Sequence, residues 1–258
     1  EPKQAILDPD TKTYQACYNY IRDFVSRYKD DPTVLMWELR NEAMLGADVD
    51  REGQKALPPG CFSDGVEPRA EYTREDSLTF DMLLRIYRDQ TAFVKDIDPN
   101  HLVTSGDACV RPECTSRRET FPDFKYRNDT LREWIANNLL SQPEPLDVAS
   151  YHWYHKFEDP EPLGAHTVDT LTSLVRATHA ARVPVLIGEF GQHPESNERD
   201  PRAESLIETI DRLEEEEVSL IALWVWHFKW QPEYTMTSDS HPELTARVAA
   251  FNAKHADQ

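Results

Sequence analysis

Short apolar segments of strand length alternate along the chain with longer segments whose apolar residues recur at a helical period. The first short segment, residues 34–39 (VLMWEL), is apolar at every position except one. A nearly continuous apolar run of this length is typical of a parallel strand that is covered on both faces. By the same criterion, strands are predicted at residues 34–39, 101–106, 146–154, 183–190 and 218–228.

The helical segments lie between these strands, and some carry start or stop signals. The segment 13–29 has an apolar stripe and stops before Pro32, and Thr73 with Asp76 forms a capping signature for a helix reaching residue 97. Helices are predicted at residues 13–29, 73–97, 130–138, 167–181, 201–217 and 241–255. One helix followed by five strand-loop-helix repeats predicts right-handed βα units in a parallel sheet.

The loops that follow the predicted strands are long, whereas the turns that lead from helix back to strand are short. Residues 44–72 and 109–128 are the longest loops, and the turn at residues 30–33 is a short one. In barrels built of βα units the active site lies after the carboxyl ends of the strands. Functional side chains are therefore expected at strand ends.

Two of the predicted strands end in a glutamate. Glu42 follows the first strand, and Glu189 lies at the end of V-L-I-G-E-F, residues 185–190. Taken singly, either glutamate is about as often structural as functional. Together they place two carboxylates on one rim of the sheet, which is what the cleavage of a glycosidic bond requires. The other polar or aromatic residues at strand ends are Asn41, Asp107, His152, Tyr154, Trp224 and Trp226.

Four motifs around these residues carry a resemblance to a known family. They are W-E-L-R-N-E (37–42), Y-H-W-Y (151–154), I-G-E-F-G (187–191) and W-V-W (224–226). In this order they resemble the retaining glycoside hydrolases on (β/α)₈ barrels, and most closely glycoside hydrolase family 5, which contains cellulases and β-mannanases. The resemblance implies an α/β fold of the TIM-barrel type and hydrolysis of a β-linked polysaccharide by double displacement.

The resemblance also implies a role for each matching residue. Glu42 corresponds to the general acid/base and Glu189 to the nucleophile, and a retaining mechanism expects their carboxyl groups about 5 to 5.5 Å apart. The implied substrate-binding residues are Asn41 at the sugar 2-hydroxyl, His152 and Tyr154 beside the nucleophile, and Trp226 under the reacting sugar. Trp153 and Trp230 are equally consistent with distant subsites and with simple cover of the rim. Neither a metal nor a cofactor is expected, because the strand ends lack a cluster of His and Asp ligands.

The predicted strands number five, and they match strands 4 to 8 of the family barrel. The first three strands have no counterpart, nor do the arginine and histidine that the family supplies from its second and third strands. We therefore expect a single domain over residues 1–258, a TIM-barrel-like fold reduced to about five βα units. Three explanations are open: a fragment of a longer product, a homo-oligomer that closes the open edges, or a reduced barrel.

Composition narrows the class of partner. The formal net charge of -19 and the pI near 4.8 argue against nucleic acid and against an anionic membrane surface, and a neutral carbohydrate fits better. There is no apolar run long enough to span a bilayer, and the first residues do not resemble a signal peptide, although a cleaved one would leave no trace. A secreted protein is expected, with a disulfide bridge among Cys61, Cys109 and Cys114.

Two functions from different classes follow from these observations. The first is a retaining glycoside hydrolase of the endo-β-1,4-glucanase or β-mannanase type. The second is a non-catalytic carbohydrate-binding or interaction protein, derived from a glycosidase barrel that lost its first strands. The two surviving glutamates and their neighbours favour the enzyme.

Overall fold

The strands form a parallel sheet in chain order. The computed structural model describes residues 3–54, 71–123, 125–155, 168–192 and 202–255. The first two strands pair with each other, as do the last three, and every ladder is parallel. A parallel bridge between Thr104 and Val148 connects the two groups. The strands are β1 (Met36–Glu38), β2 (Leu102–Thr104), β3 (Ala149–His155), β4 (Val185–Gln192) and β5 (Leu220–Leu223).

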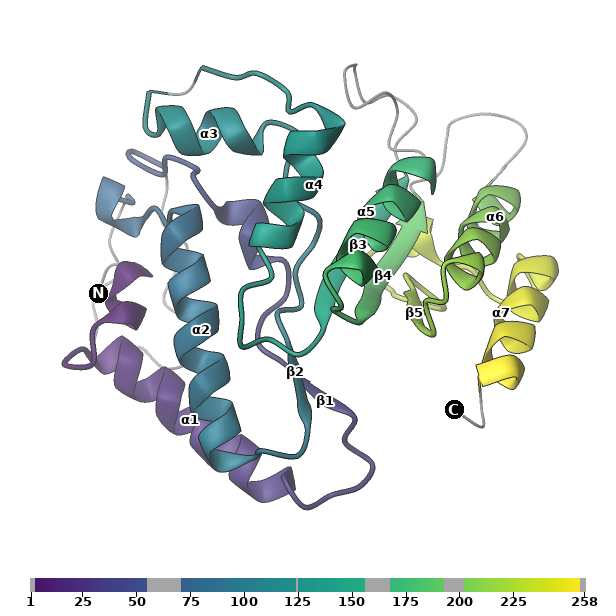
Figure 1. Ribbon diagram of the computed structural model, residues 1–258, viewed down its shortest axis with the longest axis horizontal. Helices are drawn as coiled ribbons and strands as arrows, with labels where there is room; N and C mark the ends of the chain where they lie inside the picture. Colours follow the sequence, from purple (N-terminus) through teal and green to yellow (C-terminus); the bar gives the residue numbers. More distant parts are fainter. Residues whose placement is uncertain (1–2, 55–70, 124, 156–167, 193–201, 256–258) are drawn as a thin grey trace.

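The helices follow the strands as the alternation predicts. Figure 1 shows the units in sequence order across the molecule, from the first two helices at one end to the last two at the other. Contacts link α5 to β3 and β4, and α6 to β4. The helices are α1 (Lys12–Tyr28), α2 (Phe80–Ile97), α3 (Cys114–Thr120), α4 (Leu131–Leu140), α5 (Val168–Ala180), α6 (Arg202–Glu215) and α7 (Pro242–His255).

Some predicted boundaries are wrong, and one short helix is missed. The Thr73 and Asp76 capping box exists, but it begins only a 3₁₀ turn, and α2 starts at Phe80 with Thr79 as its N-cap. The predicted loop 109–128 contains α3, which is short and polar and so lacks an apolar stripe. By contrast, the predicted helix at 130–138 begins as expected, because the Thr130 hydroxyl accepts from the backbone N–H of Glu133.

Strand alternation divides the side chains of β3 between the core and the site. Tyr151 and Trp153 are buried on the outer face, where they join a core cluster with the helices. Successive side chains of a strand point to opposite faces. His152 and Tyr154 therefore project from the opposite, inner face.

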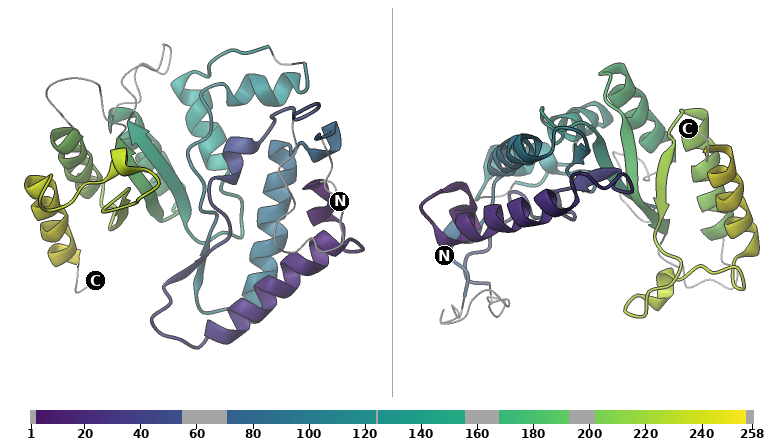
Figure 2. Two further views of the ribbon diagram at one scale, coloured as in Figure 1. Left: turned by 180° about the vertical axis from the view of Figure 1, so that it is seen from behind. Right: turned by 90° about the horizontal axis from the view of Figure 1, so that it is seen from below.

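The two outer strands each have one unpaired edge within the part of the chain that the structure describes. β1 pairs with β2 alone, and β5 pairs with β4 alone. Near these edges Leu35 is 58% exposed and Leu220 is 36% exposed. Figure 2 shows that β1 and β5 do not meet, so the barrel is not closed.

The described cysteines are not bridged. Cys17, Cys109 and Cys114 are all free thiols, and Cys61 lies outside the described residues. The expected bridge is therefore wrong for Cys109 and Cys114, which pack in the core; burial raises the pKa of Cys114 to about 12. Every helix that the structure describes is too short or too polar to cross a bilayer.

Candidate active site

Glu42 lies directly beyond β1 in an unusual backbone conformation. Its φ and ψ are 50° and 32°, in the left-handed region that residues with a Cβ rarely occupy. The backbone N–H of Glu42 donates to the carbonyl of Gly106 at 2.9 Å, which extends the pairing of β1 with β2 past the strand ends. The side chain is 28% exposed. The chain thus turns sharply at Glu42 and leaves its carboxylate at the rim.

Glu189 reaches the same rim through an irregularity in the sheet. The register between β3 and β4 shifts after Tyr151, so that His152 pairs with Glu189. A second shift follows Ile187 in the ladder between β4 and β5. A bulge of this kind re-aims a side chain. The Glu189 side chain consequently faces that of His152, with only 15% of its surface exposed.

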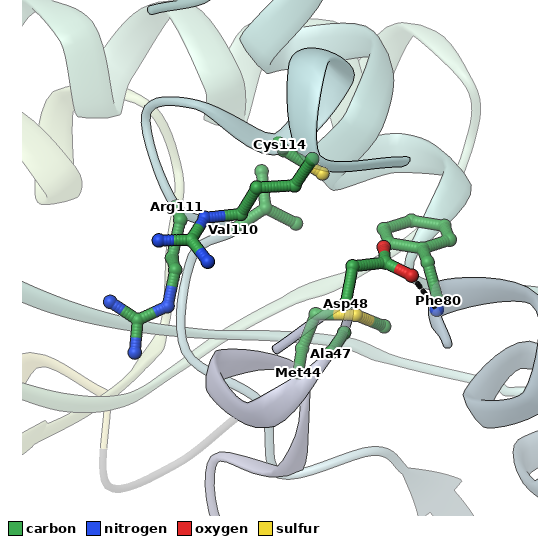
Figure 3. Close-up of a pocket in the computed structure, with 8 residues that line it drawn as sticks. Met44, Ala47, Asp48, Phe80, Val110, Arg111 and Cys114 are labelled. Carbon is green, nitrogen blue, oxygen red and sulfur yellow. Dashed lines mark hydrogen bonds between the residues drawn. The ribbon is translucent and has the colours of Figure 1, made fainter. Parts of the chain in front are cut away.

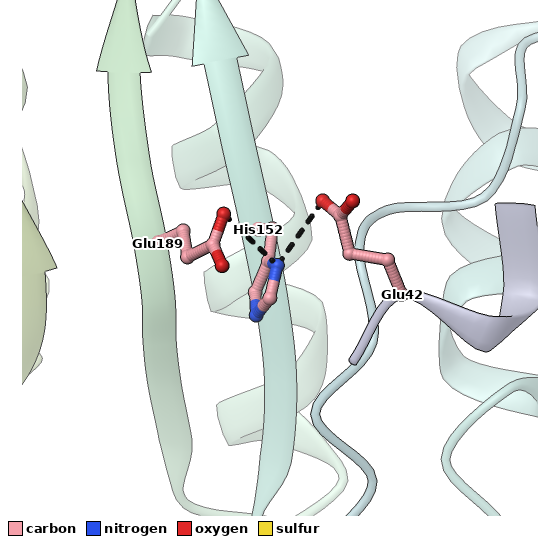
Figure 4. Close-up of side chains that lie close together, drawn as sticks. All are labelled: Glu42, His152 and Glu189. Atoms are coloured by element: carbon pink, nitrogen blue, oxygen red, sulfur yellow. Dashed lines mark hydrogen bonds and ion pairs between the residues drawn. The ribbon is translucent and has the colours of Figure 1, made fainter. Parts of the chain in front are cut away.

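The two glutamates meet across His152, as Figure 4 shows. The Nδ1 atom of His152 lies 3.2 Å from Oε1 of Glu42 and 3.5 Å from Oε2 of Glu189. The nitrogen and one carboxylate oxygen from each glutamate all lie within 4.8 Å of one another. Carboxylate oxygens this close are compatible with the 5 to 5.5 Å between carboxyl groups that is typical of retaining glycosidases. These three groups are also near enough to hold a metal ion.

The imidazole of His152 is buried between two carboxylates. Burial by itself lowers its pKa, but the hydrogen bond to Glu42 and the charges of Glu189, Glu42 and Glu38 outweigh burial and raise the pKa above its ordinary value. Its side chain is only 2% exposed. The two glutamates therefore stabilise the protonated form of His152 against the effect of its burial.

Tyr154 is the immediate partner of Glu189. Its hydroxyl donates to Oε2 of Glu189. Burial first, and then the hydrogen bond and negative charge of Glu189, raise the pKa of Tyr154, so the phenol keeps its proton. Tyr234, 5.9 Å away between ring centroids, packs edge-on against the Tyr154 ring. No sequence pattern points to Tyr234, because it lies in a short 3₁₀ turn beyond the last strand.

Two glycines of β4 leave room for these side chains. A Cβ on Gly188 would lie 2.8 Å from Nε2 of His152. A Cβ on Gly191 would lie 2.7 Å from the carbonyl oxygen of Trp224 and 3.0 Å from the Tyr154 ring. The I-G-E-F-G motif thus carries glycine where any larger residue would displace the site.

The remaining predicted residues lie apart from this cluster. Asn41 is exposed beside Glu42, and its side chain makes no hydrogen bond to any described residue. Trp226 is 55% exposed in the loop after β5, and Trp230 in the same loop is 73% exposed, with Lys229 over its ring. Trp153 is buried against Trp134, which excludes it from a distant subsite and makes it cover for the core.

The loop that follows Glu42 is anchored to α2. The buried carboxylate of Asp48 accepts from the backbone N–H of Phe80 at 3.1 Å, and Arg111 donates to the carbonyl of Leu45. Figure 3 shows Asp48 and Phe80 beside a hollow under this loop. Its volume of about 10 Å³ has room for at most one water molecule and is far too small for a sugar.

Several proteins of known structure or function are similar to this chain, although no family model matches it. Mannan endo-1,4-beta-mannosidase F of Aspergillus fumigatus is 33% identical over 181 residues, which are 69% of this chain and 31% of that protein. Mannan endo-1,4-beta-mannosidase 2 of Arabidopsis thaliana is 24% identical over 208 residues, 76% of this chain and 40% of that protein. The endo-1,4-beta-mannanase of Rhizomucor miehei superposes with a TM-score of 0.59 at 17% identity, over 98% of this chain and 64% of that structure.

These similarities confirm the resemblance that the motifs predict. The fold is a partial (β/α)₈ barrel. The chain is related to the cellulases and β-mannanases of glycoside hydrolase family 5. It spans less than half the length of the curated relatives that it matches.

Proposed function

We propose that the chain carries the catalytic pair of a retaining glycoside hydrolase that cleaves β-1,4-linked mannan or glucan by double displacement. The observation that carries the proposal is the placement of Glu42 and Glu189 on either side of His152, with carboxylate oxygens within 4.8 Å. Carboxylate oxygens this close support a retaining mechanism, in which the nucleophile attacks the sugar directly and no water lies between them.

In the first step Glu189 attacks the anomeric carbon. The bond from that carbon to the leaving oxygen breaks, and Glu42 transfers its proton to the departing oxygen. Glu189 is then bound covalently to the sugar. The Tyr154 hydroxyl, which donates to Glu189 in the free protein, orients the carboxylate for the attack.

In the second step water hydrolyses the covalent intermediate. Glu42, now a carboxylate, removes a proton from water while the water oxygen bonds to the anomeric carbon, and Glu189 leaves. The imidazole of His152 lies against both carboxyl groups, and its hydrogen bond to Glu42 and the charges of the glutamates raise its pKa against the effect of burial. We propose Asn41 as the partner of the sugar 2-hydroxyl and Trp226 as the platform under the ring.

The test is the release of reducing ends from β-1,4-mannan and β-1,4-glucan oligosaccharides by the pure protein. Glu189→Gln and Glu42→Gln should each abolish release, and azide should restore turnover to Glu42→Ala. A 2-fluoro glycoside should label Glu189, as detected by peptide mass spectrometry. Turnover by both glutamine variants equal to that of the wild type would refute the proposal.

Two controls separate catalysis from folding and from metal chemistry. Glu215→Gln alters a glutamate that is 69% exposed on α6, and it should retain full activity. A chelator should leave the rate unchanged, because the proposed steps use only carboxyl groups. Loss of activity on adding the chelator would instead indicate a metal bound by Glu42, His152 and Glu189. Glycan affinity without product release would favour the non-catalytic binding protein.

We also propose that the protein is secreted and self-associates. Secretion is supported by the size of a polysaccharide substrate, and the culture supernatant is where the protein should be found. Self-association is supported by the unpaired edge of β1 and by apolar residues near it: Tyr20 is 63% exposed, Phe24 45% and Leu35 58%. Sedimentation velocity that gives only the mass of one chain would refute self-association.

A further inference from the structure

Asp107 is a buried aspartate that lies just beyond β2. Its side chain has no exposed surface. One carboxylate oxygen accepts from the backbone N–H of Met44 at 2.8 Å, and the other accepts from the hydroxyl of Tyr87 on α2. Burial, more than any neighbouring group, raises its pKa to about 6. Burying an acid is unfavourable, and the hydrogen bonds from Met44 and Tyr87 offset part of that cost.

One such contact fixes the loop that carries Glu42. The left-handed backbone at Glu42 is disfavoured and persists only where the surroundings determine it. The Asp107 carboxylate holds Met44, two residues beyond Glu42, while the carbonyl of Gly106 holds the Glu42 N–H. The turn is therefore fixed on both sides by two consecutive residues after β2.

The backbone of Asp107 also holds the other half of the site. Its carbonyl accepts from the N–H of His152 at 3.1 Å, and the N–H of Cys109 donates to the carbonyl of His152. This contact matters because β2 and β3 form no ladder in the described residues, and the other hydrogen bonds join Val103 and Thr104 to Asp147 and Val148, before β3 begins. One residue thus contacts both sides of the pair formed by Glu42 and His152.

We propose that Asp107 is a positioning residue, whose carboxylate fixes the Met44 N–H and so holds Glu42 in line with His152 and Glu189. Asp107 does not reach substrate, and it acts only through the Glu42 turn. The kinetic consequence rests on the proposed hydrolase function. The structural consequence, the contact of Glu42 with His152, does not.

The experiment compares variants of Asp107 with variants of its surroundings. Asp107→Ala removes both acceptor oxygens, and Asp107→Ser keeps a hydroxyl that is too short to reach Met44. Both should lower kcat on the order of 100-fold, because a shift of about 1 Å at the reacting groups costs that much, while KM changes little. Asp107→Asn keeps an acceptor for Met44 and should recover most of kcat, and Tyr87→Phe, which leaves that contact in place, should lose less than Asp107→Ala.

Asp98 provides a matched control. It is also fully buried and accepts from Trp37, but it lies at the opposite end of β2, away from the site. Asp98→Asn should leave kcat unchanged at a temperature where it is folded. Three outcomes would overturn the proposal. The first is a loss of kcat in Asp98→Asn equal to that in Asp107→Ala. The others are a folded Asp107→Ala whose kcat stays within about threefold of wild type, and unfolding of both the Ala and Ser variants of Asp107.

A second readout does not depend on hydrolysis. In the NMR titration of the wild type, the pKa of His152 should be above its ordinary value, because Glu42 accepts from Nδ1. Because the charge of Asp107 itself acts on His152, Asp107→Asn is the reference, and in Asp107→Ala the pKa of His152 should fall below its value in Asp107→Asn. If the wild type releases no sugar but this pKa falls, the proposed function fails and the positioning role stands. If the wild type is active and neither kcat nor the His152 titration changes, only the positioning role fails.

Discussion

Replacing Asp107 by Asn should change how the stability of the protein depends on pH. The Asp107 carboxyl is fully buried, and its pKa is raised from 3.8 to about 6. The folded state therefore binds this proton more tightly than the unfolded chain does. Asn has nearly the same shape and does not titrate, so the difference between wild type and variant isolates the carboxyl group.

The size and sign of the effect follow from the two pKa values. Each unit of pKa difference corresponds to about 1.4 kcal/mol, so a shift from 3.8 to about 6 corresponds to about 3 kcal/mol. Because the folded pKa is the higher one, the charged carboxyl destabilises the fold fully above about pH 6. That cost disappears as the pH falls through 6 towards 3.8.

Urea unfolding followed by tryptophan fluorescence measures this directly, since Trp134 and Trp153 are buried in the core. The free energy of unfolding of Asp107→Asn minus that of the wild type should be roughly 2 kcal/mol larger at pH 8 than at pH 4, because the unfolded carboxyl is already partly ionised at pH 4. The variant would thus gain stability relative to wild type as the pH rises. A difference that is flat over this range would refute the argument that burial of this carboxyl raises its pKa.

Three further outcomes are expected. Tyr154→Phe removes the hydroxyl that donates to Glu189 and should lower kcat roughly 10- to 100-fold in steady-state kinetics, because a hydrogen bond to a charged group is worth about 1.5 to 3 kcal/mol. An unchanged kcat would contradict a role for Tyr154 in orienting Glu189. Burial alone would raise the pKa of Asp98, but hydrogen bonds outweigh it and lower this pKa to about 2. The Asp98 carboxylate should therefore add about 2 kcal/mol to the free energy of unfolding above pH 3.8, and this contribution should be lost as the pH falls towards 2. Asp98→Asn should not show that loss when its stability is measured during acid titration. Trp226→Ala should lower kcat/KM roughly 3- to 10-fold. Its stability should not change, because the Trp226 ring is half exposed. In comparison, Trp230→Ala should cause a smaller decrease in kcat/KM.

Periodicity was sufficient to predict the strands and most of the helices. Each apolar run of strand length became a strand, although shorter than the run, because the apolar residues continue past the last hydrogen-bonded pair. The predicted strand at 218–228 shows this most clearly, since β5 ends at Leu223 and the W-V-W motif lies in the loop beyond it. The polar helix α3 was missed for the opposite reason, because its seven residues carry no apolar stripe.

The motifs indicate which residues form the candidate site, but the distances between their side chains could be known only from the fold. Glu42, His152, Tyr154 and Glu189 come together as their positions at strand ends predict. The left-handed turn at Glu42 and the register shifts of β4 could not be predicted, because each depends on a neighbouring strand. Asp107 was identified as a strand-end residue without a role, since its partners Met44 and Tyr87 are distant in sequence.

The site and the open edges lie in different parts of the sheet. All contacts that set the catalytic geometry join the end of β1 to β2, β3 and β4, and none uses the free edge of β1 or of β5 among the described residues. Exposure of those edges therefore lowers stability without displacing Glu42 from Glu189. For the proposed hydrolase, the open barrel should therefore lower activity through weaker substrate binding, seen in KM, and the product should keep the anomeric configuration of the substrate.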